Sequence, residues 1–225
     1  VVIDAMGPAV GAWQQIVIFL ALASIILGAV GAIGQKNIKR LLAYSSINNV
    51  GFMLIGLAAG TQAGVEGVLT YLVVYVVTTL GAFLVVLQLR DTDGNAVESI
   101  PAMAGLASKR GWLAAAMSVF LLSLAGIPPL FGFWPKLLVF QAAVNANLVP
   151  LAVAGIVASV IGAYYYIMVI KTMVFDDPSD TEFAAPAAPV ERVLMTVSAL
   201  WLSVIGYLFI PLLAIASASA ASVLF

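Results

Sequence analysis

One lysine, Lys136, stands inside a long hydrophobic stretch of the sequence, and its amine is the group best placed to do chemistry. The nearest other basic residues are Arg110 and Lys171, and the chain between them is long enough to cross a bilayer and return. The expected reversal is at Asn145–Pro150, about ten residues or roughly 15 Å beyond the lysine. Because the hydrocarbon core of a bilayer is about 30 Å thick, we expect Lys136 near its midplane.

A lysine at that depth is suited to gaining and losing a proton. A charged side chain at the bilayer centre costs at least about 2.5–3.5 kcal/mol on insertion scales, and such groups usually face an ion path. Removal from water favours the neutral amine, so that a proton can be exchanged near neutral pH. The alternative is a lysine near a helix end whose amine reaches back to the membrane surface. The apolar residues on both sides of Lys136 favour the buried position, and no acid is expected at its depth, since Glu66 lies near the outer surface and the other acids in loops.

Gly126, Pro128 and Pro129 predict a break in the helix that carries the lysine. Each proline lacks a backbone N–H, and the residue before Pro128 is pushed away from helical geometry. An unbroken helix over 112–146 would be about 52 Å long, which is too long for one normally tilted crossing. We therefore expect two half-helices separated by unwound backbone at 126–129. Transporters place such breaks at ion sites, whereas the simpler alternative is a packing kink.

Other polar side chains in the hydrophobic segments are candidates for a path to the lysine. They are Ser45, Asn48 and Asn49 at helical spacing in one segment, Tyr75 and Thr78 in a stripe with Tyr71 in the next, and Tyr166 at the end of a later triple tyrosine. Polar faces of this kind more often make hydrogen bonds between packed helices than carry protons. Glycines such as Gly28, Gly31 and Gly34 favour close helix packing and indicate no nucleotide site.

The composition indicates a polytopic membrane protein. The chain is 64% hydrophobic and 8% charged, with a mean hydropathy of +1.16, whereas a soluble domain has about a quarter of its residues charged. It contains no cysteine and no histidine, so disulfides, thiolate metal sites and the commonest haem and metal ligand are excluded from this sequence. Proton chemistry would then use Lys, Asp, Glu, Tyr or water. Without a signal peptide or charged leader, we expect Val1 to lie inside a longer protein.

We expect a single all-α membrane domain, residues 1–225, with six transmembrane helices, the fourth of them discontinuous. The expected spans are 12–34, 40–59, 66–89, 112–146 (broken at 126–129), 149–174 and 192–216. The connections 35–40, 90–110 and 171–192 then share one side and hold eight of the nine basic residues, Lys136 being the ninth. By the positive-inside rule these connections are cytoplasmic, and both ends of the segment lie on the outer side.

Two stretches of the sequence resemble motifs of a known family. Residues 35–51 closely resemble a signature of the antiporter-like subunits of NADH–quinone oxidoreductase, respiratory complex I. Their sequence is Gln-Lys-Asn-Ile-Lys-Arg-Leu-Leu-Ala-Tyr-Ser-Ser-Ile-Asn-Asn-Val-Gly. Residues 126–136 resemble the discontinuous twelfth helix of these subunits. Within the family, Leu-Ala-Gly-Ile-Pro-Pro-Leu before Lys136 and the later triple tyrosine are most similar to the subunit N group.

The resemblance implies a bacterial inner-membrane subunit of about fourteen helices built from two inverted five-helix repeats, of which this chain holds one repeat and a final helix. It implies subunit M, small membrane subunits and the lipid bilayer as neighbours, and no nucleic acid. NADH, FMN, iron–sulfur clusters and quinone would be bound by partner subunits, and this chain would hold no cofactor, no metal and no catalytic redox residue. Lys136 falls on the lysine proposed to pass protons outward, whereas Asn49 stands where many members carry histidine.

Three functions are weighed from the sequence. The first is a proton-translocating subunit that conducts protons through Lys136, coupled to quinone reduction elsewhere in the complex. The second is a subunit of a multisubunit cation/proton antiporter, which sodium-dependent transport without NADH would favour. The third is a non-conducting structural membrane subunit, which would remain active as Lys136→Leu or Lys136→Met. An unrelated solute transporter lacks any evident substrate-binding pattern.

Overall fold

A computed structural model describes residues 9–184 and 189–223 and shows an all-helical chain. The α-helices are α2 (Val10–Ile33), α3 (Ile38–Ala58), α4 (Gln62–Gln88), α5 (Leu106–Ala125), α6 (Phe133–Asn145), α7 (Val149–Val174), α8 (Pro189–Leu202) and α9 (Ile210–Ser222), and the 3-10 helices are η2 (Pro101–Met103) and η3 (Val204–Phe209). In these two ranges the only β-structure is a set of isolated bridges between loops.

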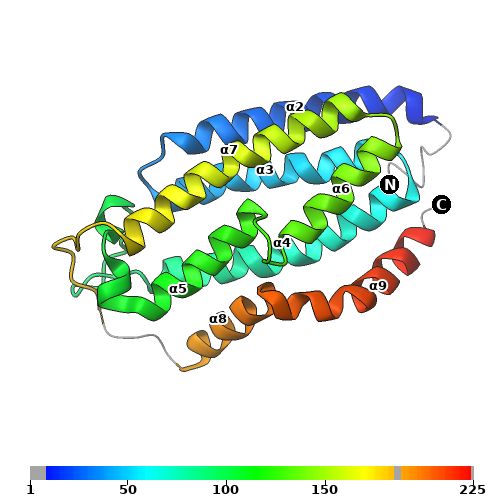
Figure 1. Cartoon of the computed structure of the whole chain (residues 1–225). Coiled ribbons are helices and arrows are strands. Elements are labelled where there is room, and N and C mark those ends of the chain that lie inside the picture. The colour runs from blue at the N-terminus through cyan, green and yellow to red at the C-terminus, as the bar shows by residue number, and fades with distance from the viewer. Residues whose placement is uncertain (1–8, 185–188, 224–225) are drawn as a thin grey trace.

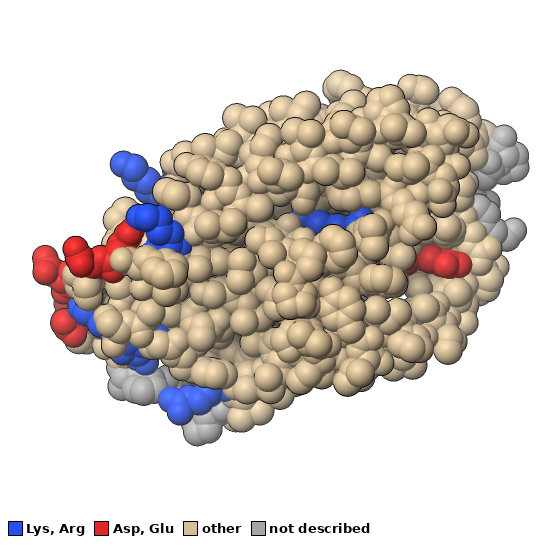
Figure 2. Space-filling model, in the orientation of Figure 1, with Lys and Arg blue, Asp and Glu red and all other residues tan. Residues whose placement is uncertain are grey.

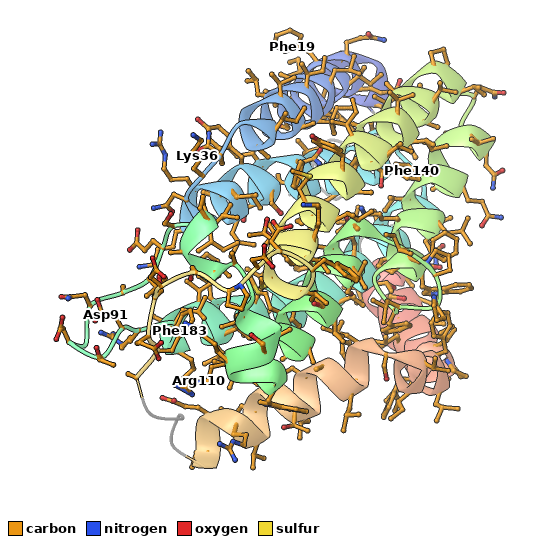
Figure 3. The ribbon with its side chains drawn as sticks, turned by 60° about the vertical axis from the view of Figure 1, so that its left-hand side comes forward. Phe19, Lys36, Asp91, Arg110, Phe140 and Phe183 are labelled. Carbon is orange, nitrogen blue, oxygen red and sulfur yellow. The ribbon has the colours of Figure 1, made fainter. Side chains whose placement is uncertain are left out.

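The helices have the length and composition of a multi-pass membrane protein. Five segments of the described chain are long and apolar enough to cross a bilayer: α2, α3, α4, α7 and the η3–α9 segment Val204–Ser222. Large apolar side chains cover the outside, and Phe19, 70% exposed on α2, points away from the bundle in Figure 3. By contrast, α6 has 13 residues, or about 20 Å of helix, and is too short to cross a core about 30 Å thick.

The helices form one elongated bundle (Figure 1). Helix α2 packs against α3 and α7, and α4 lies against α3, α5, α6, α8 and α9. Helices α5 and α6 follow one another in the same direction, with a break between them near the middle of the bundle (Figure 1). Helix α7 returns across α5, α6 and α3, so the break is enclosed by α3 and α7 on one side and by α4 on the other.

Glycines allow α2 and α3 to approach closely. An added methyl group on Gly28 would lie 2.5 Å from the backbone nitrogen of Asn48, and one on Gly31 would lie 2.4 Å from the Tyr44 ring. The packing role predicted for these two glycines is therefore confirmed. The same prediction was wrong for Gly34, where an added methyl would have no atom within 4 Å. Gly34 is instead the C-cap residue of α2.

Helix α3 begins two residues earlier than expected because Asn37 caps it. The Asn37 side-chain oxygen accepts hydrogen bonds from the backbone N–H groups of Lys39 (2.9 Å) and Arg40 (3.1 Å), which have no partner inside the helix. The Asn37 amide donates in turn to the Glu98 carboxylate at 2.9 Å. The start of α3 is thus tied to the loop that precedes α5.

Helix α4 begins at Gln62, four residues before the expected 66, with the Thr61 side chain capping it. The start of the fourth span and the extent of its break differ as well. The fourth span was expected to start at residue 112 and to break at 126–129, but α5 starts at Leu106 and the break extends from Gly126 to Gly132. The early start follows from burial, because Leu106 is 0% exposed. The helix is also irregular there, since Arg110 has non-helical backbone angles (φ −141°, ψ 58°).

The sixth expected span, 192–216, is not one continuous helix. Helix α8 ends at Leu202, a 3-10 turn occupies Val204–Phe209, and α9 begins at Ile210. Pro211, in the first turn of α9, has no N–H to donate to the carbonyl of Tyr207, and its ring disfavours an α-helical turn before it. The prediction of one continuous span was therefore wrong, because hydropathy does not register the interruption before Pro211.

Most charged residues gather at one end of the bundle, while a basic group in the middle and an acidic group toward the other end are also visible (Figure 2). Backbone hydrogen bonds join the connections at the charged end: Ile38 N–H donates to the Glu98 carbonyl at 2.8 Å, and Ala184 N–H donates to that of Arg90 at 2.9 Å. Lys36, Asp91, Arg110 and Phe183 lie at this same end in Figure 3. Both ends of the segment were predicted to lie on the outer side, but residues 1–8 and 224–225 lie outside the described residues. Residues 185–188 of the last loop lie outside them as well.

Candidate functional site

The amine of Lys136 lies inside the bundle against the end of α5. The residue is 5% exposed and sits in the first turn of α6. Its Nζ donates to the backbone carbonyls of Leu124 (2.9 Å) and Ala125 (3.0 Å) and to Oγ of Ser159 on α7 (3.0 Å). The last carbonyls of a helix have no partner within it, so ending α5 at Ala125 frees two acceptors for the amine. The side chain thus points across the break and not toward either end of the molecule.

Gly126 is required beside the lysine for two reasons. Its φ of +75° is in the left-handed region that favours glycine, and it forms the C-cap of α5. An added methyl group would also lie 2.7 Å from Cδ of Lys136. Pro128 and Pro129, which are joined by a cis peptide bond, are exposed on the outside of the break. The predicted prolines therefore end the helix without contacting the amine, whereas the predicted glycine touches the lysine side chain.

The remaining neighbour of the amine is aromatic. Nζ of Lys136 lies 4.8 Å from the centroid of the Phe52 ring, within range of a cation–π contact. Within residues 9–184 and 189–223 the ion pairs are Lys39–Glu98, Lys109–Glu182 and Lys171–Asp176. The charge of Lys136 therefore meets carbonyl dipoles, a hydroxyl and a ring face in this part of the protein.

A buried polar cluster joins α3, α4 and α7. The hydroxyl of Tyr71 donates to Oδ1 of Asn49 (2.8 Å), whose amide donates to the Ser45 carbonyl (2.9 Å) and to the Tyr166 hydroxyl (3.4 Å). The hydroxyls of Ser45 and Tyr166 also share a hydrogen bond. The structure thus brings three predicted path residues, Ser45, Asn49 and Tyr166, into one cluster.

Asn48 lies between that cluster and the lysine. Its amide donates to the Tyr165 hydroxyl at 3.3 Å, and its carbonyl oxygen is buried without a partner among the described protein atoms. Gly162 opens the space beside it, since an added methyl would lie 3.4 Å from Nδ2 of Asn48 and 3.5 Å from the Tyr165 hydroxyl. Because Ser159, Gly162 and Tyr166 recur every three to four residues, one face of α7 leads from the lysine to the cluster.

Tyr75 and Thr78 are not part of this arrangement. The hydroxyl of Thr78 donates to the Val74 carbonyl of its own helix at 2.7 Å. Tyr75 is half-buried and packs against the apolar core. No hydrogen bond in the described part of the chain joins either residue to Lys136 or to the polar cluster. Tyr71, which the sequence placed in a stripe with Tyr75 and Thr78, is the member of that stripe that joins the cluster. The sequence gave no site role to Tyr165, Phe52 or Ser159; for Ser159 the available signal was its spacing from the tyrosines along α7.

Glu66 is on the far side of α6 from the lysine. It lines a cavity of about 280 Å³ between α4, α6 and α9, together with Gln141 and Asn145. With 3.6 residues per turn, Gln141 and Asn145 lie on the face of α6 opposite Lys136. The cavity and the amine are therefore separated by the helix itself.

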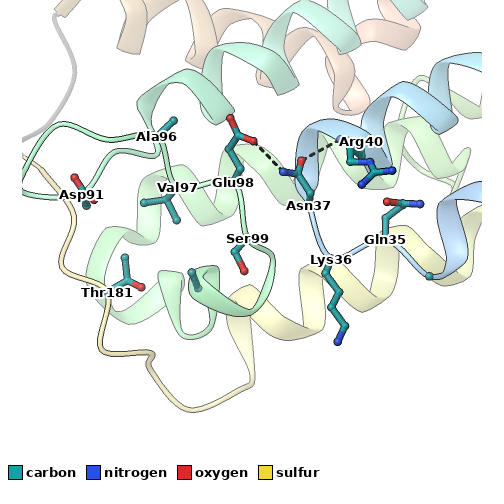
Figure 4. Close-up of a pocket in the computed structure, with 12 residues that line it drawn as sticks. Gln35, Lys36, Asn37, Arg40, Asp91, Ala96, Val97, Glu98, Ser99 and Thr181 are labelled. Carbon is teal, nitrogen blue, oxygen red and sulfur yellow. Dashed lines mark hydrogen bonds between the residues drawn. The ribbon is translucent and has the colours of Figure 1, made fainter.

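A polar cavity of about 750 Å³ lies at the charged end, where Gln35, Lys36, Asn37, Arg40, Asp91 and Glu98 are among its lining residues (Figure 4). Hydrogen bonds from Lys39 and Asn37 hold the pKa of the Glu98 carboxyl below its usual value. Lys39 is also its ion-pair partner at 2.6 Å. Both charges are partly exposed, and such pairs contribute little to stability. This cavity lies where the connections before α3 and α5 meet.

Comparison with known proteins gives the same family from sequence and from structure. The family described as "NADH:quinone oxidoreductase/Mrp antiporter, TM" matches residues 1–162. The chain is 82% identical over 225 residues to NADH-quinone oxidoreductase subunit N of Sphingopyxis alaskensis, covering 100% of this chain and 47% of that protein. It is 49% identical over 210 residues to subunit N 1 of Rhizobium meliloti, covering 93% of this chain and 43% of that protein. The chain thus spans about half the length of the curated relatives it matches.

Solved structures agree with this result. A chain of respiratory complex I from Thermus thermophilus with bound Aureothin superposes with a TM-score of 0.77 at 33% identity, over 88% of this chain and 45% of that one. A chain of the Mrp complex from Dietzia sp. superposes with a TM-score of 0.82 at 20% identity, over 95% and 47% of the two chains, which shows a shared fold. The resemblance to subunit N seen in the sequence motifs is confirmed, and the chain belongs to the NADH:quinone oxidoreductase/Mrp antiporter transmembrane family.

Proposed function

We propose that this chain is the C-terminal part of a proton-translocating, antiporter-like subunit of an NADH–quinone oxidoreductase, and that Lys136 carries the proton. One observation supports this proposal above the others. The Lys136 amine is buried at a helix break and held by two free carbonyls and a hydroxyl. The names of the similar proteins, NADH-quinone oxidoreductase subunit N, support the choice of complex.

The geometry suits a group that alternates between charged and neutral forms. A lysine ammonium has three N–H donors, and Leu124, Ala125 and Ser159 supply three acceptors within 3.0 Å. A hydrogen bond to a charged group is worth about 1.5–3 kcal/mol, and placing a lysine at the bilayer centre costs at least about 2.5–3.5 kcal/mol. Since the energy of one such hydrogen bond is similar to the cost of burying the charge, moving one acceptor away changes whether the charged or the neutral amine is favoured.

The polar face of α7 and the cluster on α3 supply an inner route. Ser45 is seven residues from the start of α3 at Ile38, or about 10 Å from the charged end of the bundle. Hydroxyl groups both donate and accept, so Ser159, Tyr165 and Tyr166 can pass protons in either direction. In our proposal, protons reach Lys136 from the charged end through these hydroxyls and water between them, and the Asn48 and Asn49 amides position the hydroxyls by hydrogen bonds.

The proposed membrane arrangement has six crossings. Helices α5 and α6 together make the fourth, discontinuous crossing, and α8, η3 and α9 make the sixth. The charged end, with connections 35–40, 90–110 and 171–192, faces the cytoplasm of a bacterial inner membrane. Subunit M and small membrane subunits would be neighbours, and NADH, FMN, iron–sulfur clusters and quinone would belong to partner subunits. Quinone reduction there would drive the change around Lys136.

The test is Lys136→Ala in the full-length subunit of the assembled complex. We expect the rate of proton translocation to fall by about a hundredfold or more, the scale of a lost proton-transfer group. Lys136→Arg should fail as well, because arginine keeps its charge and does not release its proton. Lys36→Ala, an exposed lysine at the charged end, is the matched control. Near-normal translocation by Lys136→Ala would reject the proposal.

A second candidate is a subunit of a cation/proton antiporter. The family description includes Mrp antiporters, and the fold matches the Mrp complex from Dietzia sp.. Sodium-dependent proton exchange by the full-length protein in vesicles without NADH would favour this function. A structural subunit without conduction predicts instead that Lys136→Met assembles and translocates normally.

A further inference from the structure

Two helix breaks lie against each other in the middle of the bundle. One is the α5–α6 break at Gly126–Gly132, and the other is the α8–α9 break at Ser203–Phe209 (Figure 1). The Phe131 N–H donates to the Leu202 carbonyl at 2.8 Å. The Tyr207 hydroxyl donates to the Leu130 carbonyl at 3.2 Å. Unpaired backbone N–H and carbonyl groups are costly at membrane depth, and each break supplies hydrogen-bond partners for backbone groups of the other.

Aromatic rings join the same two segments. The Phe131 ring is 0% exposed and meets Trp201 edge-to-face at 5.3 Å and Tyr207 at 5.4 Å between centroids. These distances and tilts are those of favourable aromatic pairs. Gly206 leaves room for the ring, since an added methyl would lie 2.6 Å from Cγ of Phe131 and 2.3 Å from the Trp201 carbonyl.

The residues held by this contact also begin the helix of the lysine. The Phe133 N–H donates to the Leu130 carbonyl at 3.1 Å, and the Trp134 N–H donates to the Phe131 carbonyl at 3.1 Å. Lys136 lies in this first turn of α6. A displacement of Leu130 and Phe131 would therefore move the amine relative to the carbonyls at the end of α5.

We propose that residues 201–207 form a clamp that sets the position of Lys136 against the end of α5. The inference rests on the proposed function, because it assigns to Gly206 and Tyr207 the role of positioning residues for the proton carried by the lysine. Neither residue exchanges that proton. The clamp determines how many acceptors the amine meets.

The test uses two clamp variants of the full-length subunit in the assembled complex. Gly206→Ala introduces the clash, and Tyr207→Phe removes the hydroxyl while keeping the ring. Gly111→Ala, where an added methyl has no atom within 4 Å, and Tyr164→Phe, at an exposed tyrosine on α7, are the matched controls. We expect the pH profile of proton translocation to shift by about half a unit or more in both clamp variants and to remain unchanged in both controls.

A second readout follows the break directly. Backbone hydrogen exchange over residues 126–136 should become about tenfold faster in Gly206→Ala and Tyr207→Phe, since both loosen hydrogen-bonded backbone. Helix α2 packs against α3 and α7, so its backbone exchange should stay at the wild-type rate in both variants. General destabilisation would instead raise the exchange rate in α2 as well.

The outcomes separate the two proposals. Normal translocation by Lys136→Ala means that the proposed function has failed. If Lys136→Ala is inactive while both clamp variants match their controls in pH profile and hydrogen exchange, the clamp is overturned and the proposed function stands. If Gly206→Ala does not assemble, Tyr207→Phe decides alone, and an unchanged pH profile in that variant overturns the clamp.

Discussion

The amine of Lys136 is held by groups from two other parts of the chain. Leu124 and Ala125 contribute carbonyls that are free because α5 ends there, and Ser159 contributes the only side-chain acceptor among the described contacts. Backbone carbonyls do not change their charge with pH, whereas a hydroxyl can rotate and also donate. At this scale Ser159 is thus the group able to link the amine to the polar face of α7.

Ser159→Ala in the assembled complex is expected to reduce proton translocation by about tenfold, since a hydrogen bond to a charged group is worth about 1.5–3 kcal/mol. The measurement is proton uptake into vesicles per NADH oxidised. Ser118→Ala is the control, because the Ser118 hydroxyl bonds the Ala114 carbonyl of its own helix at 2.7 Å. Equal translocation by the two variants would contradict a role for Ser159.

At the scale of elements, close helix contacts determine where the polar residues lie. Gly28 lets α2 rest directly on the backbone of α3 at Asn48, the residue between the lysine and the polar cluster. A side chain at position 28 would push α3 away from α2. The close contact at Gly28 on α2 thus helps to set the position of the polar residues of α3.

Gly28→Ala is expected to destabilise the protein by about 1–3 kcal/mol, the usual cost of overpacking a well-packed contact. Its added methyl would lie 2.5 Å from the Asn48 nitrogen. Thermal unfolding of the full-length protein in detergent is the measurement. Gly34→Ala, where the methyl has no atom within 4 Å, should unfold at the wild-type temperature. A similar loss in both variants would indicate a general effect of replacing glycine and not a close helix contact.

On the scale of the whole molecule, most charges lie at one end (Figure 2), Glu66 lies toward the other, and Lys136 lies deep in the bundle. Eight of the nine basic residues belong to the three connections predicted on one side, and hydrogen bonds hold those connections together. Such an asymmetry is the usual determinant of orientation in a membrane. The opposite end of the described chain holds the start of α2 and the end of α9 (Figure 1).

Single cysteines test this orientation, since the chain contains none of its own. In a cysteine-free full-length background, an impermeant thiol reagent should label Thr92→Cys, in the loop at the charged end, only in inverted vesicles. It should label Gln62→Cys, at the first turn of α4, only in right-side-out spheroplasts. A permeant reagent should label both in either preparation. Reversed labelling would mean that the charged end faces outward.

The sequence by itself determined the membrane class, the approximate helical segments, the isolated lysine and the helix break before it. These features depend on local properties: the hydropathy of about twenty consecutive residues, the missing N–H of proline and the conformational freedom of glycine. The same local signals explain why the family motifs around Gly126 and Lys136 are recognisable without a structure.

The tertiary structure alone decided which groups meet the lysine. Ser159 and Phe52 come from helices distant in the sequence, and their contacts depend on how α3 and α7 pack against α6. Likewise, the sixth span was predicted as continuous although Pro211 lies within it, and the contact of this second break with Phe131 depends on backbone groups that only packing brings together. Hydropathy reports whether a segment is buried, and it carries no information about which carbonyl or ring a buried amine will face.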